Sequence, residues 1–562
     1  MDIDPLRNIW SVYGWELALL PEPAERRLAI HSCRRSFGED LMWHLQALRE
    51  GVPLALTATA DVAGLLLGGD GVQVRLVPEG RDGLLLEAKG CDLGLSMPKH
   101  FGYGQRIGDR RALVLSSQAH NYTGVGVATG TLAVGGPEEA LPYGHRRPRG
   151  SDLAVVAEGG RILLRLTVGA REPDPQQPLP ALVDLATAAA VVQADWNAFR
   201  TNLPAVPAAH SDCAELAWWT LWSCFVRAEG HFAHDACLMS KCFMTNVWSW
   251  DHCFNAMALA GTRPRQALEQ FLLPFHHQAA SGALPDCFRA DAEVIWAVSK
   301  PAIHGWAFAR MQKLHPYTAE DLRCVYHHLE RWTTYWLQFR DLDGNGLPEV
   351  PMGCDVQDNG ASYLDSFFVT SPDAAAYLAL QQRTLAQLAR SLGHDQDAWR
   401  WEVMAKRLID SMLRLLWDGA EFYSRDRHGN RTTERCASSL IMPLCLGAEL
   451  PPDVFSITAK RLEHEFLGPF GVASQAFASP LYRDDEYWLG SVWPPLQLLL
   501  CDGLAAGGRD DLARRIAQGF LAACARAGGF HECFDARTGA GQRARSYSWT
   551  ASTAIELMRR WG

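Results

Sequence analysis

The sequence lacks the features that mark secreted and membrane proteins. Its 15 cysteines are scattered and never spaced as C-x-x-C, which argues against a disulfide framework or a zinc site. No apolar run approaches the roughly 20 residues that span a bilayer, and the acidic start MDIDPLRNIW does not resemble a secretory signal. We therefore expect a cytoplasmic protein with no membrane partner, whose cysteines, such as Cys224 and Cys324, are reduced core residues.

Clustered positive charge is missing as well. The formal net charge is -10 over 562 residues, with no extended basic run, whereas nucleic acids and anionic membranes attract clustered lysine and arginine. The sequence also has no Walker loop, no G-x-S-x-G and no H-E-x-x-H, so kinase, esterase and metalloprotease chemistry lack support. A small neutral or polar ligand fits better, and a homo-oligomer is compatible with this composition.

The first third of the chain predicts an antiparallel β-sandwich. Between about residues 50 and 170, short apolar runs such as VQVRLV and ILLRLTV are separated by glycine-rich turns such as GGDG and EGGR, which is typical of such a domain. A proline-rich break, a helix-like stretch and a second Pro/Ala joint follow. We place the β-sandwich domain at 1–172, a linker with a helix at 173–209, and a second domain at 210–562.

The sequence of the second domain predicts a series of helices. Asp212 with Glu215, and Thr318 with Asp321, are spaced as capping boxes. Further helical patterns lie near 252–262, 265–278, 298–314, 372–392, 395–417, 433–446, 453–466, 493–506, 510–527 and 549–561. About twelve helices without a fixed internal repeat favour a closed double ring, an (α/α)6 barrel, over an open solenoid.

Four loops of this domain combine tryptophan with acidic residues. They are NVWSWDHCF from 246, DLDGNGLPEVPMGCDVQDNGASYLD from 341, DDEYWLGSVWPP from 484 and FHECFDARTGAG from 530. An indole packs well against the C–H face of a sugar ring. Glycoside hydrolysis needs one protonated and one ionised carboxyl group. The loops therefore indicate a carbohydrate site, although core filling explains many of the 20 tryptophans.

Together the four loops resemble glycoside hydrolase family 63 and related inverting (α/α)6-barrel glycosidases, which include trehalases. The likeness rests on W-x-W-D ending at Asp251, on the D-N step at Asp358, on Y-W-x-G-x-V-W-P from Tyr487, and on E-x-x-D-x-x-T-G from Glu532 with the SWT at 548–550. It covers about residues 240 to 562. It implies an inverting hydrolase of α-linked glucosides or related small glycosides, with no organic cofactor.

The resemblance also implies roles for individual residues. Asp358 corresponds to the general acid and Glu532 to the general base. The substrate-binding residues that it suggests are Trp248, Trp250, Asp251, Lys300, Asp355, Asn359, Trp488, Trp493 and Trp549.

The pattern around the acid departs from the family. The usual G-x-D-N-S would select Asp355, which follows Gly353 and Cys354, whereas the D-N pair itself stands at Asp358 and Asn359 and is followed by glycine. We favour Asp358 because the D-N pair is kept there. Asp355 remains the alternative acid.

The stretch from 341 also contains candidate metal ligands. Asp341, Asp343 and Asn345 resemble the first half of a calcium loop, but Met352 stands where an EF-hand needs its last carboxylate. A structural calcium held by these three residues and a distant carboxylate is one expectation. An Asx-rich turn is the other.

Two rival functions stay open at this point. A disaccharide phosphorylase or sugar lyase on the same barrel would account for the loops, although a phosphorylase needs no carboxylate base at Glu532. A non-catalytic carbohydrate-binding protein would also keep an aromatic cleft, and the altered D-N-G sequence keeps this alternative alive.

Overall fold

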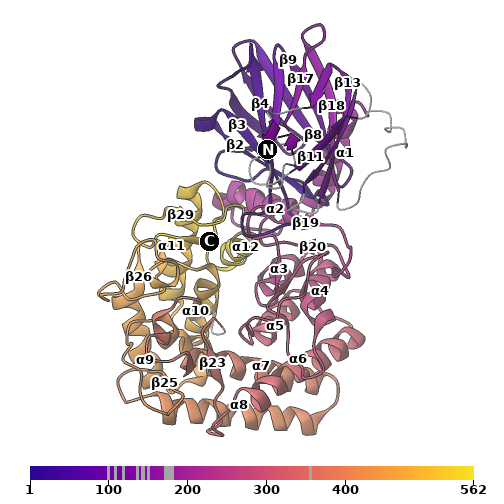
Figure 1. Ribbon diagram of the computed structural model, residues 1–562. Helices are drawn as coiled ribbons and strands as arrows, with labels where there is room; N and C mark the ends of the chain where they lie inside the picture. The colour runs from indigo at the N-terminus through magenta and orange to yellow at the C-terminus, as the bar shows by residue number, and fades with distance from the viewer. Residues whose placement is uncertain are drawn as a thin grey trace.

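The chain forms a β-domain that stands against one side of a ring of helices (Figure 1). The computed structural model describes residues 1–97, 102–106, 110–116, 121–134, 138–140, 146–148, 152–169, 183–353 and 357–562. In these ranges no helix is long and apolar enough to cross a bilayer. The 14 cysteines described are all free; most are buried, including Cys224, but Cys324 is exposed, contrary to its predicted place in the core.

Two antiparallel sheets make up the β-domain. The first has the order β1 (Asp2–Ile3), β6 (Thr57–Asp61), β7 (Leu65–Gly69), β8 (Val72–Glu79), β9 (Gly83–Lys89), β18 (Arg161–Gly169), β13 (Asn121–Thr129), β12 (Arg111–Ser116), β11 (Gly102–Arg106). The second has the order β14 (Thr131–Val134), β17 (Leu153–Val156), β10 (Asp92–Ser96), β4 (Leu41–Arg49), β3 (Arg27–Ser32), β2 (Leu17–Glu22), with β5 (Val52–Pro53) beside β4. A short ribbon of β15 (Glu138–Ala140) and β16 (Arg146–Pro148) is separate.

The core of the domain lies between these sheets and confirms the predicted sandwich. Leu86 and Leu164 of the first sheet and Leu45 and Leu93 of the second are fully or almost fully buried in one cluster. In β8 buried and exposed residues alternate along the first half of the strand, as expected when one face of the sheet is exposed to solvent. The strands β2, β3 and β4, which precede residue 50, were not predicted.

Six inner helices close into a ring. They are α3 (His252–Ala260), α5 (His304–Leu314), α7 (Pro372–Ser391), the 3-10 helix η7 (Met442–Glu449), α10 (Pro494–Ala506) and α12 (Ser548–Trp561). Each contacts the next in this order, and α12 contacts α3. The closed double ring predicted from the helix count is therefore confirmed.

Outer helices surround this ring (Figure 1). They are α2 (Ser211–Cys224), α4 (Pro264–Leu272), α6 (Ala319–Phe339), α8 (Asp395–Leu416), α9 (Pro452–Arg461) and α11 (Asp510–Ala527). A linker helix, α1 (Leu185–Arg200), packs on β8 and β9 of the sandwich and on α2 of the ring. It therefore connects the two domains by contact as well as by sequence.

Local signals predicted some helix ends correctly. Thr318 and Asp321 form the expected capping box at the start of α6. The capping box predicted at Asp212 is wrong, because α2 has no side-chain cap and Glu215 pairs instead with Arg200 of α1, at 2.7 Å.

The helix predicted at 433–446 is replaced by two short 3-10 helices, η6 (Ser438–Leu440) and η7. Pro443 lies in the first turn of η7, and Gly447 interrupts it with a φ of 56°. A Cβ at Gly503 of α10 would lie 2.0 Å from the carbonyl oxygen of Leu444. The tight approach of these two inner elements therefore depends on glycine.

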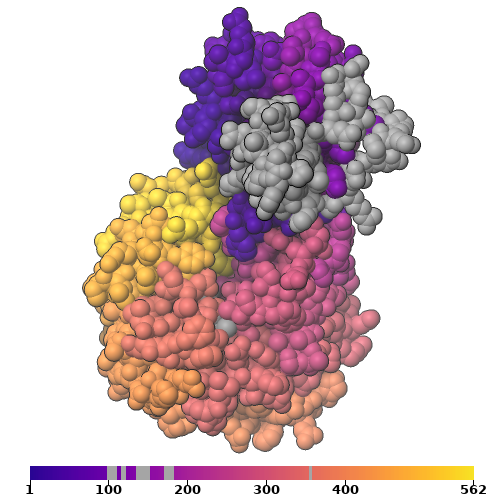
Figure 2. Space-filling view, viewed as in Figure 1, coloured from indigo at the N-terminus to yellow at the C-terminus, as the bar shows by residue number. Residues whose placement is uncertain are grey.

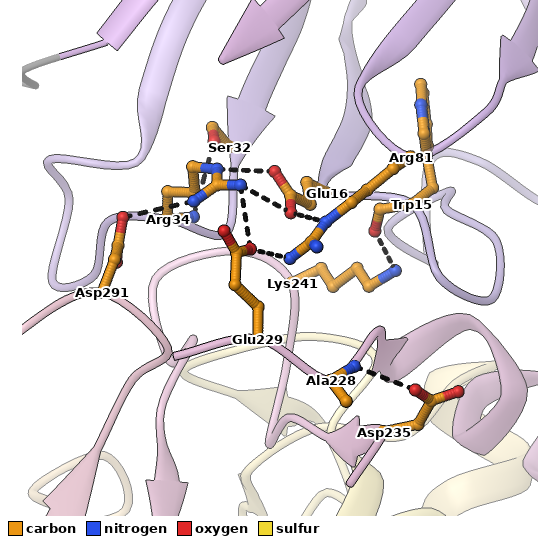
Figure 3. Close-up of polar contacts among 10 residues, drawn as sticks. All are labelled: Trp15, Glu16, Ser32, Arg34, Arg81, Ala228, Glu229, Asp235, Lys241 and Asp291. Atoms are coloured by element: carbon orange, nitrogen blue, oxygen red, sulfur yellow. Dashed lines mark hydrogen bonds and ion pairs between the residues drawn. The ribbon is translucent and has the colours of Figure 1, made fainter. Parts of the chain in front are cut away.

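A cluster of ion pairs around the buried Glu16 joins the two domains (Figure 3). Glu16 of the β-domain is 3% exposed and accepts hydrogen bonds from Arg34, at 2.6 Å from Nε, and from Arg81. Both arginines also pair with Glu229, and Arg34 pairs with Asp291 at 3.4 Å. Because Glu229 and Asp291 belong to the helical domain, the cluster fixes how the domains meet.

The segment at 4–16 adds a second attachment. Lys241 of the helical domain is buried and donates to the backbone oxygens of Val12, at 2.7 Å, and Trp15. Burial lowers the pKa of Lys241 to about 8. Asn8 donates to the carbonyl of Gly528 and Ile9 to the hydroxyl of Ser546. In the space-filling view the β-domain accordingly rests on the ring beside the yellow C-terminal segment (Figure 2).

Removing the guanidinium of Arg34 should weaken this junction. We expect Arg34→Met to lower the free energy of unfolding by about 3 kcal/mol, because it leaves the charge of Glu16, which is 3% exposed, with less compensation for its burial. Urea denaturation of the full chain measures the change. Asp410→Asn, which breaks the exposed pair with Lys406, is the control and should cost less than about 1 kcal/mol. Equal costs for the two variants would contradict the role given to the pair of Arg34 and Glu16.

Candidate active site

The motif loops gather at one end of the ring. In a double ring the outer helices run back, so the inner helices are parallel and share one N-terminal end. Asp251 directly precedes α3, and Trp493 directly precedes α10. Lys300, Asp358 and Glu532 lie in the loops before α5, α7 and α12. Residues far apart in sequence therefore meet in one site.

Asp358 lies beside a lysine. Lys300 places its Nζ 3.8 Å from Oδ1 of Asp358 and 3.5 Å from Oδ1 of Asp286. The side chain of Asp358 is 44% exposed. Partial enclosure by protein raises the pKa of Asp358, while the charge of Lys300 opposes this increase. The Gly353 backbone lies alongside, since a Cβ there would come 3.6 Å from Oδ1 of Asp358.

Glu532 is far more enclosed, with 4% of its surface exposed. Tyr487 donates from its hydroxyl to Oε1 at 3.2 Å, and the backbone N–H of Ala544 donates to Oε2 at 3.4 Å. Burial raises the pKa of Glu532 to about 7. The charge of Asp358 adds to this increase, whereas the hydrogen bonds from Tyr487 and Ala544 oppose it. The carboxyl group is therefore able to gain or lose a proton near neutral pH.

The hydroxyl of Tyr487 lies near both carboxyl groups. It donates its proton to Glu532, and its presence also lowers the pKa of Asp358. Tyr487 has a φ of 59°, a left-handed conformation that is rare for a bulky residue. The fold thus holds this tyrosine in a strained position between the two acids.

Two further acids complete the group around Lys300. Asp251 is 4% exposed, and burial raises its pKa well above the ordinary value despite the charge of Lys300. Asp286 is 9% exposed, and burial likewise raises its pKa. Ser249 donates its backbone N–H to the carbonyl of Asp286 at 3.1 Å, so the W-x-W-D loop and the Asp286 loop support each other.

Asn359 connects two of the predicted loops. Its side-chain oxygen accepts from the backbone N–H of Trp488 at 2.9 Å, and its amide donates to the carbonyl of Glu486 at 3.1 Å. Tyr487 lies between these two attachment points. Asn359 therefore holds the loop that positions the shared hydroxyl.

The tryptophans expected to bind substrate form a packed wall. Trp488 and Trp493 stack with their ring centroids 4.0 Å apart, and Trp493 meets Trp549 edge to face at 5.9 Å. Trp549 meets Trp250 at 5.6 Å and donates to the carbonyl of Glu532 at 3.3 Å. These four residues are at most 4% exposed, and Trp248 is 7% exposed. They mainly support the acidic residues and present little free surface.

The structure brings together nearly all the predicted catalytic and substrate-binding residues. Asp355 lies outside the described residues. Asp286 and Tyr487 were not predicted as site residues, although Tyr487 is the first residue of one of the quoted motifs. Asp286 lies in the short segment ALPDCF, and nothing local distinguishes it from a turn residue.

The predicted metal ligands form a turn. The backbone N–H groups of Asn345, Gly346 and Leu347 donate to the side chains of Asp343, Asp341 and Asn345 respectively, at 2.9 to 3.1 Å. This is the Asx-rich arrangement named as the alternative.

Some features of the turn still suit a cation. Oδ1 of Asp341 is buried and accepts no hydrogen bond. Glu349 is 4% exposed nearby, and burial together with the charges of Asp343 and Asp341 raises its pKa. Three carboxyl groups around one turn would be stabilised by calcium. The calcium site stays a prediction.

Comparison with known proteins identifies the family. The family described as "Mannosylglycerate hydrolase MGH1-like glycoside hydrolase domain" matches residues 244–550, more than half of the chain. The chain belongs to this family. It is a glycosidase, and the resemblance to glycoside hydrolase family 63 is confirmed.

Relatives of this glycoside hydrolase cover different parts of it. Mannosylglycerate hydrolase of Rubrobacter radiotolerans is 23% identical over 412 residues, 55% of this chain and 90% of the relative. Periplasmic trehalase of Salmonella schwarzengrund is 24% identical over 151 residues, 26% of each chain.

Solved structures show the same fold. The mannosylglycerate hydrolase of Thermus thermophilus, in complex with glucose, matches with a TM-score of 0.53 and 19% identity over 62% of this chain and 98% of that one. A bacterial glucoamylase complexed with acarbose matches with a TM-score of 0.64 and 11% identity over 98% of this chain and 93% of that one. The second match extends over the β-domain and the helical ring together.

Burial of Glu532 should make stability depend on pH. Its folded pKa of about 7 lies above the ordinary value of 4.5, so ionisation disfavours the folded state as pH rises from about 4.5 to 7. We expect Glu532→Gln to be more stable than the wild type by about 2 to 3 kcal/mol at pH 8, and by little at pH 4.5. Urea unfolding at both pH values measures this.

The exposed Glu25 supplies the control. Glu25→Gln should shift stability by less than about 0.5 kcal/mol at both pH values. A gain for Glu532→Gln that is the same at pH 4.5 and pH 8 would show that burial of the ionised carboxylate is not its cause.

The calcium prediction is tested by thermal unfolding. If calcium binds the turn, a concentration 100 times the dissociation constant stabilises the protein by about 2.7 kcal/mol. We expect added calcium to raise Tm, EDTA to reverse the rise, and Asp343→Asn to abolish it. Asp410→Asn on the outside of α8 is the control and should keep the full response. A wild-type Tm that does not change with millimolar calcium excludes the site.

Proposed function

We propose that the protein hydrolyses small α-linked glycosides of glucose or a related sugar with inversion of configuration. The observation that carries this proposal is the pair of carboxyl groups, Asp358 and Glu532, which both lie near the Tyr487 hydroxyl. An inverting glycosidase needs two carboxyl groups far enough apart for a water molecule, with a mean separation of about 6.5 to 9.5 Å. Two carboxyl groups that approach the same hydroxyl from different loops suit this requirement.

The unequal exposure of the two groups supports their roles. Asp358 is 44% exposed, so the oxygen of a departing aglycone can reach it from the open side. Glu532 is 4% exposed and held by Tyr487 and Ala544, so it suits a single enclosed water. Asp358 then protonates the leaving oxygen, and Glu532 removes a proton from the attacking water.

The reaction conserves protons and needs no organic cofactor. As the bond from the anomeric carbon to the leaving oxygen breaks, that oxygen takes the proton of Asp358. The water attacks the opposite face of the sugar and passes its proton to Glu532, and solvent then restores both groups. Lys300, which contacts Asp358, and Asp251, which lies near Lys300 and Glu532, would bind hydroxyl groups of the sugar being transferred.

The substrate class follows from the relatives. The proteins similar to this chain are named as hydrolases of mannosylglycerate and as trehalases, whose names point to small glycosides. The proposal therefore includes α-glucosides and α-mannosides of low molecular weight, and keeps the cytoplasmic location expected from the sequence. Dependence of turnover on phosphate would instead identify a phosphorylase.

The decisive experiment follows the anomer released from a panel of α-linked glucosides and mannosides, mannosylglycerate included, by NMR. We expect the β-anomer first, at a rate that phosphate does not change. Asp358→Asn and Glu532→Gln should each lower kcat by about 10²- to 10⁴-fold. Asp355→Asn, at the alternative acid, should lower kcat less than Asp358→Asn does, and Asp410→Asn on the exposed face of α8 is the control that should keep full activity.

Glycosyl fluorides separate the two roles. Fluoride leaves without protonation, so Asp358→Asn should still hydrolyse the fluoride of the sugar that the wild type accepts, whereas Glu532→Gln should not. Release of the α-anomer first would overturn inversion. Full activity of Asp358→Asn, together with loss in Asp355→Asn, would move the general acid to Asp355.

A further inference from the structure

Two exposed phenylalanines stand beside the W-x-W-D loop, and one of them comes from the β-domain. Phe37 is 54% exposed and lies in the loop between β3 and β4, while Phe243 is 48% exposed and lies in the helical domain. Their rings meet edge to face with centroids 5.9 Å apart. Two adjacent exposed rings form a small apolar patch, and exposed apolar patches often mark binding surfaces.

Both residues are held in an unfavourable backbone conformation. Phe37 has a φ of 55° and Phe243 a φ of 65°, the left-handed region that bulky side chains rarely occupy. Strain of this kind persists where surrounding contacts impose it, and it concentrates at binding sites. Two adjacent aromatic residues sharing the same strain therefore point to a function for their placement.

Hydrogen bonds between the domains impose this placement. The backbone N–H of Phe37 and the hydroxyl of Ser36 both donate to the carbonyl of Phe243 at 2.7 Å. Asp40 accepts from the backbone N–H of Phe243 at 3.0 Å and, through its other oxygen, from that of Gly38 at 3.0 Å. The two loops are thus connected as one rigid unit although they belong to different domains.

This unit is continuous with the proposed catalytic residues. Phe37 meets the indole of Trp248 edge to face at 6.2 Å. Trp248 pairs in a two-stranded ribbon, β21 (Val247–Trp248) with β22 (Cys287–Phe288), opposite Cys287. Asp286, the residue before Cys287, lies 3.5 Å from Lys300, which contacts Asp358. A chain of contacts therefore leads from the aromatic pair through Trp248 and Asp286 to Lys300 and Asp358.

We infer that Phe37 and Phe243 form the binding surface for the leaving group, and that this group is a sugar ring. Exposed aromatic faces bind the C–H face of a pyranose, and Asp358 would protonate the oxygen that joins that ring to the sugar being transferred. The inference rests on the proposed function. It makes the β-domain part of the substrate site and predicts a preference for ring-shaped over compact leaving groups.

The test compares one disaccharide with the fluoride of the same sugar. The fluoride has no leaving-group ring, so it reports the chemistry at Asp358 and Glu532 alone. We expect Phe37→Ala and Phe243→Ala each to lower kcat/KM for the disaccharide about tenfold, mainly through KM, and to leave kcat/KM for the fluoride within twofold. Phe37→Tyr should restore the disaccharide value.

Further variants separate binding from loop structure. Phe37→Gly removes the ring while suiting the left-handed backbone, so it should stay folded and lose disaccharide activity as Phe37→Ala does. Trp399→Ala, which removes an equally exposed aromatic from α8, is the matched control and should change neither substrate. Calorimetry of the disaccharide with Glu532→Gln should show about tenfold weaker binding when Phe37→Ala is added.

The outcomes are distinguishable. If the wild type hydrolyses neither substrate, the proposed function fails. If it hydrolyses both and the phenylalanine variants match it on both, only the leaving-group surface is overturned. Equal losses on disaccharide and fluoride would also overturn it, because they would show that the phenylalanines support the site without contacting the leaving group.

Discussion

The structure depends on the contact that closes the ring, between the first inner helix and the last. The amide of Asn255 in α3 donates to the hydroxyl of Ser548 at 3.0 Å, and the hydroxyl of Ser552 donates to its carbonyl oxygen at 2.9 Å. All three residues are fully buried, where an unpaired polar group would be costly. This contact brings Asp251 and Glu532 to the same end of the barrel, although some 280 residues separate them in the chain.

Inside the ring, the balance of charge is unusual. Asp251, Asp286 and Asp358 gather around Lys300, Glu532 lies near Asp251 and Asp358, and burial raises the pKa of each acid. Lys300 beside three of these acids and Arg543 near Glu532 do not offset the burial of four carboxylates, so the group retains protons at a pH where isolated acids would have lost them. Interacting sites of this kind titrate together. The protons needed for acid and base catalysis are therefore a property of the whole cluster.

Much of this architecture could be predicted from the sequence, because its signals are local. The 3.6-residue period of the outer helices and the capping box at Thr318 depend on neighbours within a few positions, and the four motif loops mark the site. The strands from Leu17 to Arg49 and the break at Gly447 could not be found in this way. The break depends on the close approach of Leu444 to Gly503 of another helix.

The least predictable parts of the site depend on tertiary contacts. Asn359 was expected to touch substrate, but its amide is used to hold the loop of Tyr487. Asp286 becomes notable only because the fold brings Lys300 to it. Phe37 lies some 200 residues before Phe243, and no pattern within the β-domain indicates that its loop is completed by the other domain.

The attachment of the segment at 4–16 has a consequence for how the chain is made. Asn8 and Ile9 bind Gly528 and Ser546, residues that leave the ribosome about 520 residues later. The sandwich can form while translation continues, since domains fold as units. Its docking surface must wait until the last inner helix has been synthesised. During this interval the segment at 4–16 remains without these partners, and its attachment forms only after residues 528 and 546 have been synthesised.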